Sequence, residues 1–177
     1  MKHLKLLLIS LFVINFTHAQ TNATDTAIAA INLKSSAEKM GRLFIEKNYT
    51  QYVKFIHPKI LQMAVGQAKI IALLKKSLKD VESQGITFQN VVIGSSSKII
   101  ITKTGLQSVV PQLLQLKTKT GLLDATSYLI ATSADKGKTW YFIDTSGKTL
   151  AQMKSAFPTL SDELVIPEKK PPVMHND

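Results

Sequence analysis

The sequence contains no cysteine and only one arginine, Arg42. The absence of cysteine excludes disulfides, thiolate nucleophiles and thiolate metal ligands, so the fold depends on packing for its stability. Lysine supplies nearly all of the 22 basic residues, which stand against 12 acidic ones and a formal net charge of +10. Proteins that read nucleic acids or phosphates favour arginine's bidentate fork, and here the lysines are scattered with few aromatic residues between them. We therefore interpret the charge as a solvated basic surface and expect no nucleic-acid partner.

Histidine is scarce, and its positions argue against a zinc site. His57 is the one histidine away from the chain ends, because the others are His3, His18 and His175. Zinc sites need several ligands at short spacing. The two Gly-Lys-Thr sequences at 137–139 and 147–149 lack the glycine five residues earlier that a phosphate-binding loop requires. The sequence therefore predicts neither a metal site nor a cofactor.

The first nineteen residues have the pattern of a signal peptide. Lys2 and Lys5 precede an apolar run of eleven residues, 6–16, and Thr17-His18-Ala19 follows it. At about 1.5 Å per residue, such a run spans about half of a ~30 Å hydrocarbon core, which disfavours a membrane anchor. We expect cleavage after Ala19 and export to the periplasm or the extracellular medium, with no transmembrane span.

The first half of the chain has the apolar periodicity of helices. Pro58 separates two short segments, because the residue before a proline disfavours the helical conformation. The expected helices are 24–47, 50–57, 58–64 and 66–84. The last of these has five apolar positions that we expect to be buried, namely Ile70, Leu73, Leu74, Leu78 and Val81. Gly85 is placed to end this helix as its C-cap.

The second half of the chain has β-branched runs separated by turn residues. The expected strands are 86–93, 98–103, 106–119, 122–133 and 139–144. Their short connections predict an antiparallel meander. Pro111 cannot donate a ladder hydrogen bond, so it predicts a bulge or an edge. A last helix over 150–157 precedes the end of the chain.

Helices and strands are segregated along the chain, which predicts an α+β fold. We expect N-terminal helices packed on a curved antiparallel sheet of about four to five strands. The expected organisation is a signal peptide at 1–19, a single α+β domain at 20–166 and a flexible tail at 167–177, because the tail is rich in proline and lysine. A mature chain of this length suits one hydrophobic core.

One local motif is specific. Residues 133–140 match the Asp-box pattern S-x-D-x-G-x-T-W at every specified position, through Ser133, Asp135, Gly137, Thr139 and Trp140. Asp135 is expected to accept backbone N–H groups across a turn, Gly137 to adopt a positive φ, and Trp140 to pack on the strand. Sialidases carry such boxes as repeats in propeller blades, and one copy cannot build a propeller. The motif therefore predicts a structural hairpin.

Three segments carry a resemblance to a known superfamily. FIHPKILQMAVGQAKIIALLKKSL leads into GITFQNVVIG, and SYLIATSADKGKTWYFID closes the strand region. Together with the order of elements, they resemble the nuclear-transport-factor-like, ketosteroid-isomerase-like superfamily. The resemblance implies a cone fold, in which the sheet wraps a helix and leaves a mouth at one end. Its members include isomerases, dehydratases and proteins without catalysis, so the fold does not decide the function.

Three residues are candidates for a ligand site under this resemblance. Asp124 and Tyr128 lie four apart on a strand and therefore on one face, and a carboxylate with a phenol is the pairing of a ketosteroid-isomerase-like enzyme. The opposite face is more apolar, which favours an outward Asp124. His57 is predicted to cap or pack, with a place at the mouth of the cone as the alternative.

The function that follows is an exported, non-catalytic domain that binds a small apolar or amphipathic ligand or an envelope component. The alternative is a small-pocket isomerase or lyase. The sequence leaves the oligomeric state open.

Overall fold

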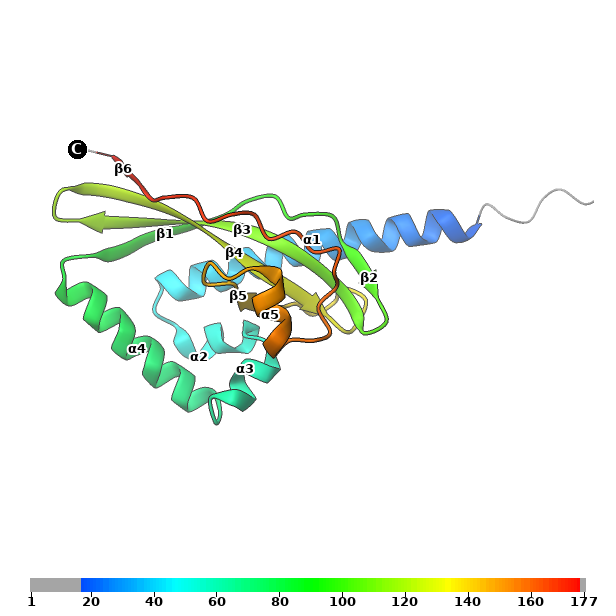
Figure 1. The fold of residues 1–177 in the computed structure, drawn as a ribbon, viewed down its shortest axis with the longest axis horizontal. Coiled ribbons are helices and arrows are strands. Elements are labelled where there is room, and N and C mark those ends of the chain that lie inside the picture. The colour runs from blue at the N-terminus through cyan, green and yellow to red at the C-terminus, as the bar shows by residue number, and fades with distance from the viewer. Residues whose placement is uncertain (1–16, 176–177) are drawn as a thin grey trace, which may run out of the picture.

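The structure is a computed structural model that describes the backbone of residues 17–175 and the side chains of residues 25–175. The run 6–16, which carries the prediction of a signal peptide, lies outside the described residues. The fold is α+β, as predicted, with helices packed on a curved, unclosed antiparallel sheet (Figure 1). The sheet has six strands rather than four to five.

The helices and strands follow the predicted order. The helices are α1 (Thr17–Ile45), α2 (Tyr49–Tyr52), the 3-10 helix η1 (Val53–Phe55), α3 (Pro58–Met63), α4 (Gln67–Ser83) and α5 (Leu150–Ala156). The strands are β1 (Thr87–Ile93), β2 (Ile100–Thr102), β3 (Gly105–Thr118), β4 (Gly121–Ser133), β5 (Tyr141–Asp144) and β6 (Val173–His175).

A long hairpin of β3 and β4 forms the centre of the sheet. The hydrogen-bonded order is β1-β3-β4-β5, with β2 also pairing with β3 and β6 with β4. The additional strand comes from the predicted tail, because Val173–His175 pair with residues 122–124 of β4. The tail runs along the sheet in Figure 1 (red), and all three β6 side chains are exposed.

Pro111 lies in an interior strand, not at an edge of the sheet. It pairs with Tyr128 of β4 on one side. On the other side, β1 ends at Ile93 and β2 begins at Ile100, and the Gly94 N–H donates to the Pro111 carbonyl at 2.9 Å. The proline therefore occupies the stretch of β3 whose neighbouring strand is interrupted, where its missing N–H has no partner to lose.

Both faces of the sheet are covered, by different parts of the chain. Successive strand residues point to opposite faces. On one face, Val110 and Leu129 pack with Ala29, Leu33 and other residues of α1. The other face is covered by α5 and the segment after it, through Val109, Tyr128, Ile130, Ile143, Met153, Phe157, Leu160 and Leu164. The sheet therefore separates two apolar clusters.

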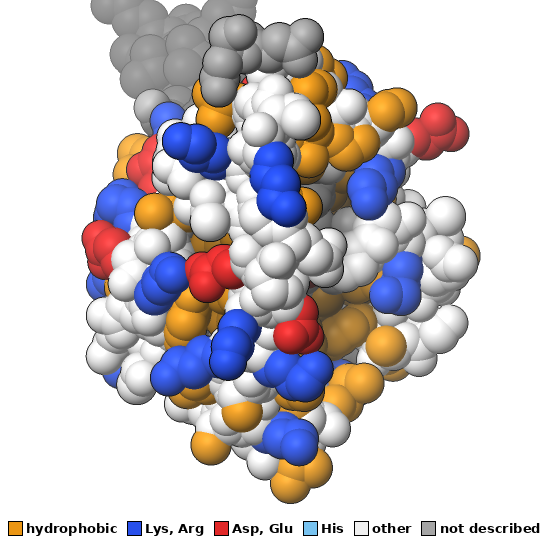
Figure 2. Space-filling model, turned by 90° about the vertical axis from the view of Figure 1, so that its left-hand side faces the viewer, with side chains coloured by type: hydrophobic (Ala, Val, Ile, Leu, Met, Phe, Trp, Pro, Cys, Tyr) orange, Lys and Arg blue, Asp and Glu red, His pale blue; other side chains and the backbone are white. Residues whose placement is uncertain are grey.

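The expected burial of α4 is wrong. None of its residues is fully buried, and Leu73 is 48% exposed. The physical reason is that α4 contacts α2 and η1 at its inner side and stands away from the sheet in Figure 1. Its apolar face is therefore only partly covered. Figure 2 shows this end of the molecule, where lysines surround apolar side chains.

Within residues 17–175, none of the helices combines the length and hydropathy that a membrane crossing requires, although α1 extends over 29 residues.

Candidate functional site

The Asp-box hairpin connects β4 and β5 through hydrogen bonds of its own side chains. One Asp135 oxygen, Oδ1, accepts the Thr139 N–H at 2.8 Å and the Ser133 hydroxyl at 2.9 Å. The Gly137 N–H donates to Ser133 Oγ at 2.9 Å, and Gly137 has a φ of +81°. The backbone N–H of Thr139 lowers the pKa of Asp135, because it stabilises the carboxylate.

The same hairpin is fastened to α1. Asn32 Nδ2 donates to the Gly137 carbonyl at 3.0 Å. Trp140 is 1% exposed and packs among core residues that include Ala29 and Leu33 of α1. Neither of the two cavities described below is lined by a hairpin residue. These contacts are those of a structural anchor between β4, β5 and α1.

His57 caps α3 at its N-terminus. Its Nδ1 accepts the Lys59 N–H at 3.1 Å, and its ring stands edge-on to Phe157 at 5.3 Å between centroids. The backbone N–H of His57 donates to the Phe142 carbonyl of β5 at 3.0 Å. Burial lowers the pKa of His57, and the Lys59 charge lowers it further. The residue thus joins α3, β5 and the end of α5, and it lines neither described cavity.

The lowered pKa of His57 predicts a pH-dependent stability. In the unfolded chain, the His57 imidazole becomes protonated as the pH falls below about 6.5. In the folded chain it becomes protonated only at a lower pH. The contribution of His57 to the free energy of unfolding is therefore fully present above about pH 6.5 and is lost as the pH falls toward and through the lower pKa of the folded state. We expect His57→Asn to keep a capping oxygen and to lose less melting temperature than the wild type between about pH 7.5 and 5.5. Equal losses in both proteins would contradict this role.

Asp124 and Tyr128 share a face of β4 but have different surroundings. Asp124 Oδ1 accepts Gln115 Nε2 at 3.3 Å, and its Oδ2 lies 3.2 Å from His175 Nε2 of β6. Tyr128 is 8% exposed and belongs to the cluster beneath α5. The structure therefore does not bring His57, Asp124 and Tyr128 into one cavity. Tyr128 alone of the three lines a described cavity.

That cavity, called the β4-edge cavity here, has a volume of about 270 Å³. It lies where β4 lacks a strand partner, because β5 pairs with residues 129–132 and β6 with residues 122–124. Its walls are β4, the turn after β5 and the C-terminal segment, through Tyr128, Asp144, Thr145, Ser146, Ile166 and Lys169 among others. The Thr145 N–H donates to the Tyr128 carbonyl at 3.1 Å and holds the turn against the strand.

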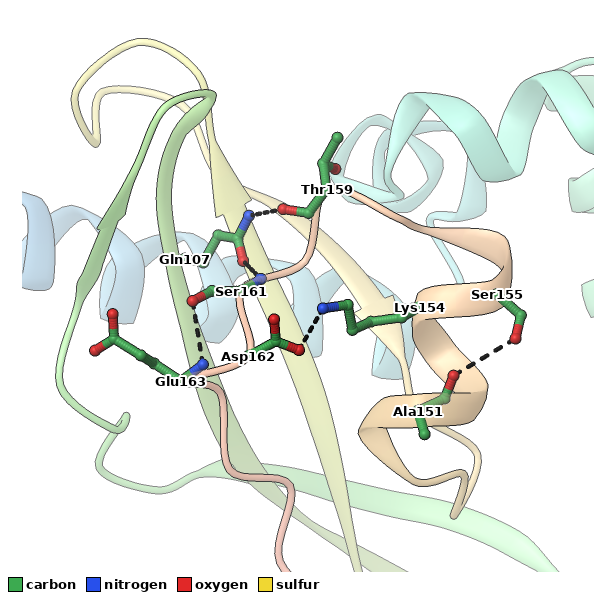
Figure 3. A network of polar contacts seen from close by, with 8 residues as sticks. All are labelled: Gln107, Ala151, Lys154, Ser155, Thr159, Ser161, Asp162 and Glu163. Carbon is green, nitrogen blue, oxygen red and sulfur yellow. Dashed lines mark hydrogen bonds and ion pairs between the residues drawn. The ribbon is translucent and has the colours of Figure 1, made fainter.

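The C-terminal wall of the cavity is positioned by a buried glutamine. Gln107 of β3 is 3% exposed. Its Nε2 donates to the Thr159 carbonyl at 2.9 Å, and its Oε1 accepts the Ser161 N–H at 2.9 Å (Figure 3). Lys154 of α5 pairs with Asp162 in the same network. The chain continues from this attachment to Ile166. The hydrogen bonds of Gln107 therefore fix the C-terminal wall of the cavity relative to the sheet.

Two hydroxyl groups make the β4-edge cavity a polar site. Tyr128 and Thr145 are 8% and 1% exposed, and neither side-chain hydroxyl has a hydrogen-bond partner among residues 25–175. In that same part of the chain, the one side-chain polar atom that is both sealed from solvent and unpartnered is Trp140 Nε1. The two hydroxyls are therefore reachable. Because solvent reaches them, both hydroxyls can exchange water for a hydrogen-bonding group of a bound ligand.

Charged side chains of both signs lie at the same cavity. The Asp144 carboxylate accepts the Ser146 N–H at 2.6 Å and shapes the turn. Burial raises the pKa of Tyr52 to about 12, and the nearby Asp144 charge adds to the shift. Lys169 contributes a cation from the C-terminal segment, without an ion pair among the described residues. The cavity can therefore receive both donors and acceptors.

The sequence reasoning missed Asp144, Thr145 and Lys169. The sequence did indicate a turn after β5, because residues 144–147, Asp-Thr-Ser-Gly, are typical turn residues. No local signal placed Lys169 beside it, because that contact depends on the path of the predicted tail back across the sheet.

A second hollow, of about 600 Å³, lies between α1 and the loop before β2, along Ala27, Ala30 and residues 96–99. It is wide open to solvent and mainly apolar, and it holds no unpartnered buried group within the described residues. It offers less specific recognition than the β4-edge cavity.

Among the described residues, no three His, Cys, Asp or Glu side chains are placed to hold a metal ion. No protein-family model matches the chain, and no curated protein matches it, so the residues of the β4-edge cavity carry the functional argument.

Proposed function

We propose that this protein is an exported, non-catalytic domain that binds a small amphipathic ligand in the β4-edge cavity. The observation that carries the proposal is the pair of buried hydroxyls, on Tyr128 and Thr145, that line the cavity without a partner among the described residues. Binding sites commonly combine an apolar wall with a few convergent polar groups. Leu114 and Ile166 supply the apolar part of this one.

The volume limits the ligand. About 270 Å³ lies just below the range of about 300–1,000 Å³ that is typical of ligand pockets. The expected ligand is a small molecule with a hydroxyl or carboxylate for Tyr128, Thr145 and Lys169 and a short apolar part.

A thermal-shift screen of small hydroxy and carboxylic acids on the mature chain tests the proposal. A ligand at a hundredfold excess over its Kd stabilises the folded state by about 2.7 kcal/mol. Tyr128→Phe and Thr145→Val should each weaken binding by about two- to tenfold, because each removes one hydrogen bond. Both variants should leave the unliganded stability nearly unchanged, because neither hydroxyl has a partner among residues 25–175 to lose and both are reached by solvent.

Tyr141→Phe is the matched control, since it removes a tyrosine hydroxyl outside the cavity. Ligand affinity that is the same in the wild type and in all three variants would overturn the site. A screen without any saturable ligand would overturn the proposed function.

The isomerase or lyase alternative has one supporting observation. Asp144, not Asp124, is the carboxylate that shares a cavity with Tyr128. A base and a phenolic donor in one cavity are what such an enzyme needs. Turnover of a bound ligand that Asp144→Asn abolishes while binding persists would favour the enzyme, and binding without turnover favours the non-catalytic domain.

Export rests on the pattern of the first nineteen residues. Protein recovered from an exporting host should begin at Gln20, as an intact-mass measurement would show. A soluble intracellular product that retains Met1 to Ala19 would contradict export.

A further inference from the structure

The turn between α3 and α4 projects apolar side chains into solvent. Met63 is 65% exposed and Val65 is 90% exposed, and Leu73 in the second turn of α4 is 48% exposed. The turn is ordered by backbone hydrogen bonds, from the Val65 N–H to the Gln62 carbonyl at 3.1 Å and from the Gly66 N–H to the Leu61 carbonyl at 2.8 Å. Val65 has a φ of +59°, which is an outlier for a β-branched residue. Packing within the fold therefore does not explain a valine at this position, because its side chain is almost entirely exposed.

Lysines follow this turn along the outer face of α4. At 3.6 residues per turn, Ile70, Leu74 and Leu78 share one face, which is half-buried toward α2 and η1. Four exposed lysines occupy the remainder of the helix surface, namely Lys69, Lys75, Lys76 and Lys79. Lys76 pairs with Asp80 at 3.1 Å, and the other three have no ion pair within the described residues. At the lower end of Figure 2, apolar side chains project beside lysines.

We propose that the α3–α4 turn and α4 dock this domain on an anionic lipid surface. Met63 and Val65 enter the headgroup region, while Lys69, Lys75 and Lys79 contact anionic headgroups. The shape favours lipid over a protein partner, because the apolar side chains stand on a projecting turn. No described cavity or groove includes them. This surface is separate from the β4-edge cavity and does not depend on ligand binding there.

Vesicle binding by the mature chain tests the proposal. We expect it to bind phosphatidylcholine vesicles that contain about 30% phosphatidylglycerol, to bind pure phosphatidylcholine at least tenfold more weakly, and to lose binding in about 0.5 M salt. Val65→Asn should weaken binding about tenfold, because it removes the most exposed large apolar side chain of the described residues. It should not impair folding, because asparagine tolerates a positive φ better than valine does.

The lysine contribution has a charge-matched control. The triple variant Lys69→Gln, Lys75→Gln, Lys79→Gln should weaken binding on the order of a hundredfold. The triple variant Lys103→Gln, Lys136→Gln, Lys138→Gln loses the same charge from exposed positions on the β2–β3 turn and the Asp-box hairpin, far from α4 in Figure 1. It should retain most of the binding. Equal loss in the two triple variants, unchanged binding of Val65→Asn, or absence of binding to anionic vesicles would each overturn the proposal.

Discussion

Replacing Gly137 by alanine is expected to lower the free energy of unfolding by about 2–5 kcal/mol. Gly137 has a φ of +81°, which L-residues with a Cβ adopt at a cost of about 1–2 kcal/mol. An added Cβ would also lie 2.3 Å from Ala29 Cβ and 2.8 Å from Ala29 Cα of α1. Ala29 is fully buried, so the helix or the hairpin has to move, and such overpacking costs about 1–3 kcal/mol more.

Gly147→Ala separates the two contributions to this loss. Gly147 has a similar φ of +74°, but the nearest atom to its added Cβ is Lys169 Cδ at 3.3 Å, on an exposed side chain. In denaturant unfolding, we expect Gly147→Ala to lower the free energy of unfolding by only about 1–2 kcal/mol, which is the cost of the positive φ alone. Equal losses for the two variants would show that the hairpin is not pressed against α1.

Truncating Trp140 to alanine is expected to lower the free energy of unfolding by about 3–5 kcal/mol, the usual range for a buried aromatic residue. The indole is 1% exposed and connects the hairpin to α1, Val110 and Phe142 in the first apolar cluster. Because Trp140 is the only tryptophan, unfolding should be followed by circular dichroism rather than by fluorescence.

Trp140→Phe should be much less damaging than Trp140→Ala. The indole N–H is sealed from solvent without a partner among the described residues, a condition that costs about 1–3 kcal/mol in the folded wild type. Phenylalanine removes this cost and retains most of the packing, which offsets part of the volume that is lost. A phenylalanine variant as unstable as the alanine variant would show that the N–H has a partner or that the indole shape is essential.

The predictions for Asp124 and Tyr128 show how far local sequence patterns determine a site. Strand periodicity correctly put both residues on one face of β4, with the apolar residues Leu129 and Ala131 on the face that meets α1. It could not show what covers each residue. Tyr128 lies beneath the C-terminal segment, whereas Asp124 lies farther along the strand beside His175. The carboxylate that lines the same cavity as Tyr128 is Asp144, which follows the Asp-box hairpin in the sequence.

The sequence by itself determined the order and type of the elements, because apolar periodicity, turn glycines and prolines act within a few residues of one another. It also determined the Asp-box hairpin, because the hydrogen bonds of the Ser133 and Asp135 side chains within the motif join residues two to four positions apart. The tertiary structure decided the rest. It left α4 partly covered, because α2 and η1 reach only its inner side, and it added β6, because the edge of β4 had unpaired backbone groups to offer. It also created the β4-edge cavity, whose walls come from β4, the turn after β5 and residues 166–169. Such contacts depend on how distant segments fold back on the sheet, which no local pattern encodes.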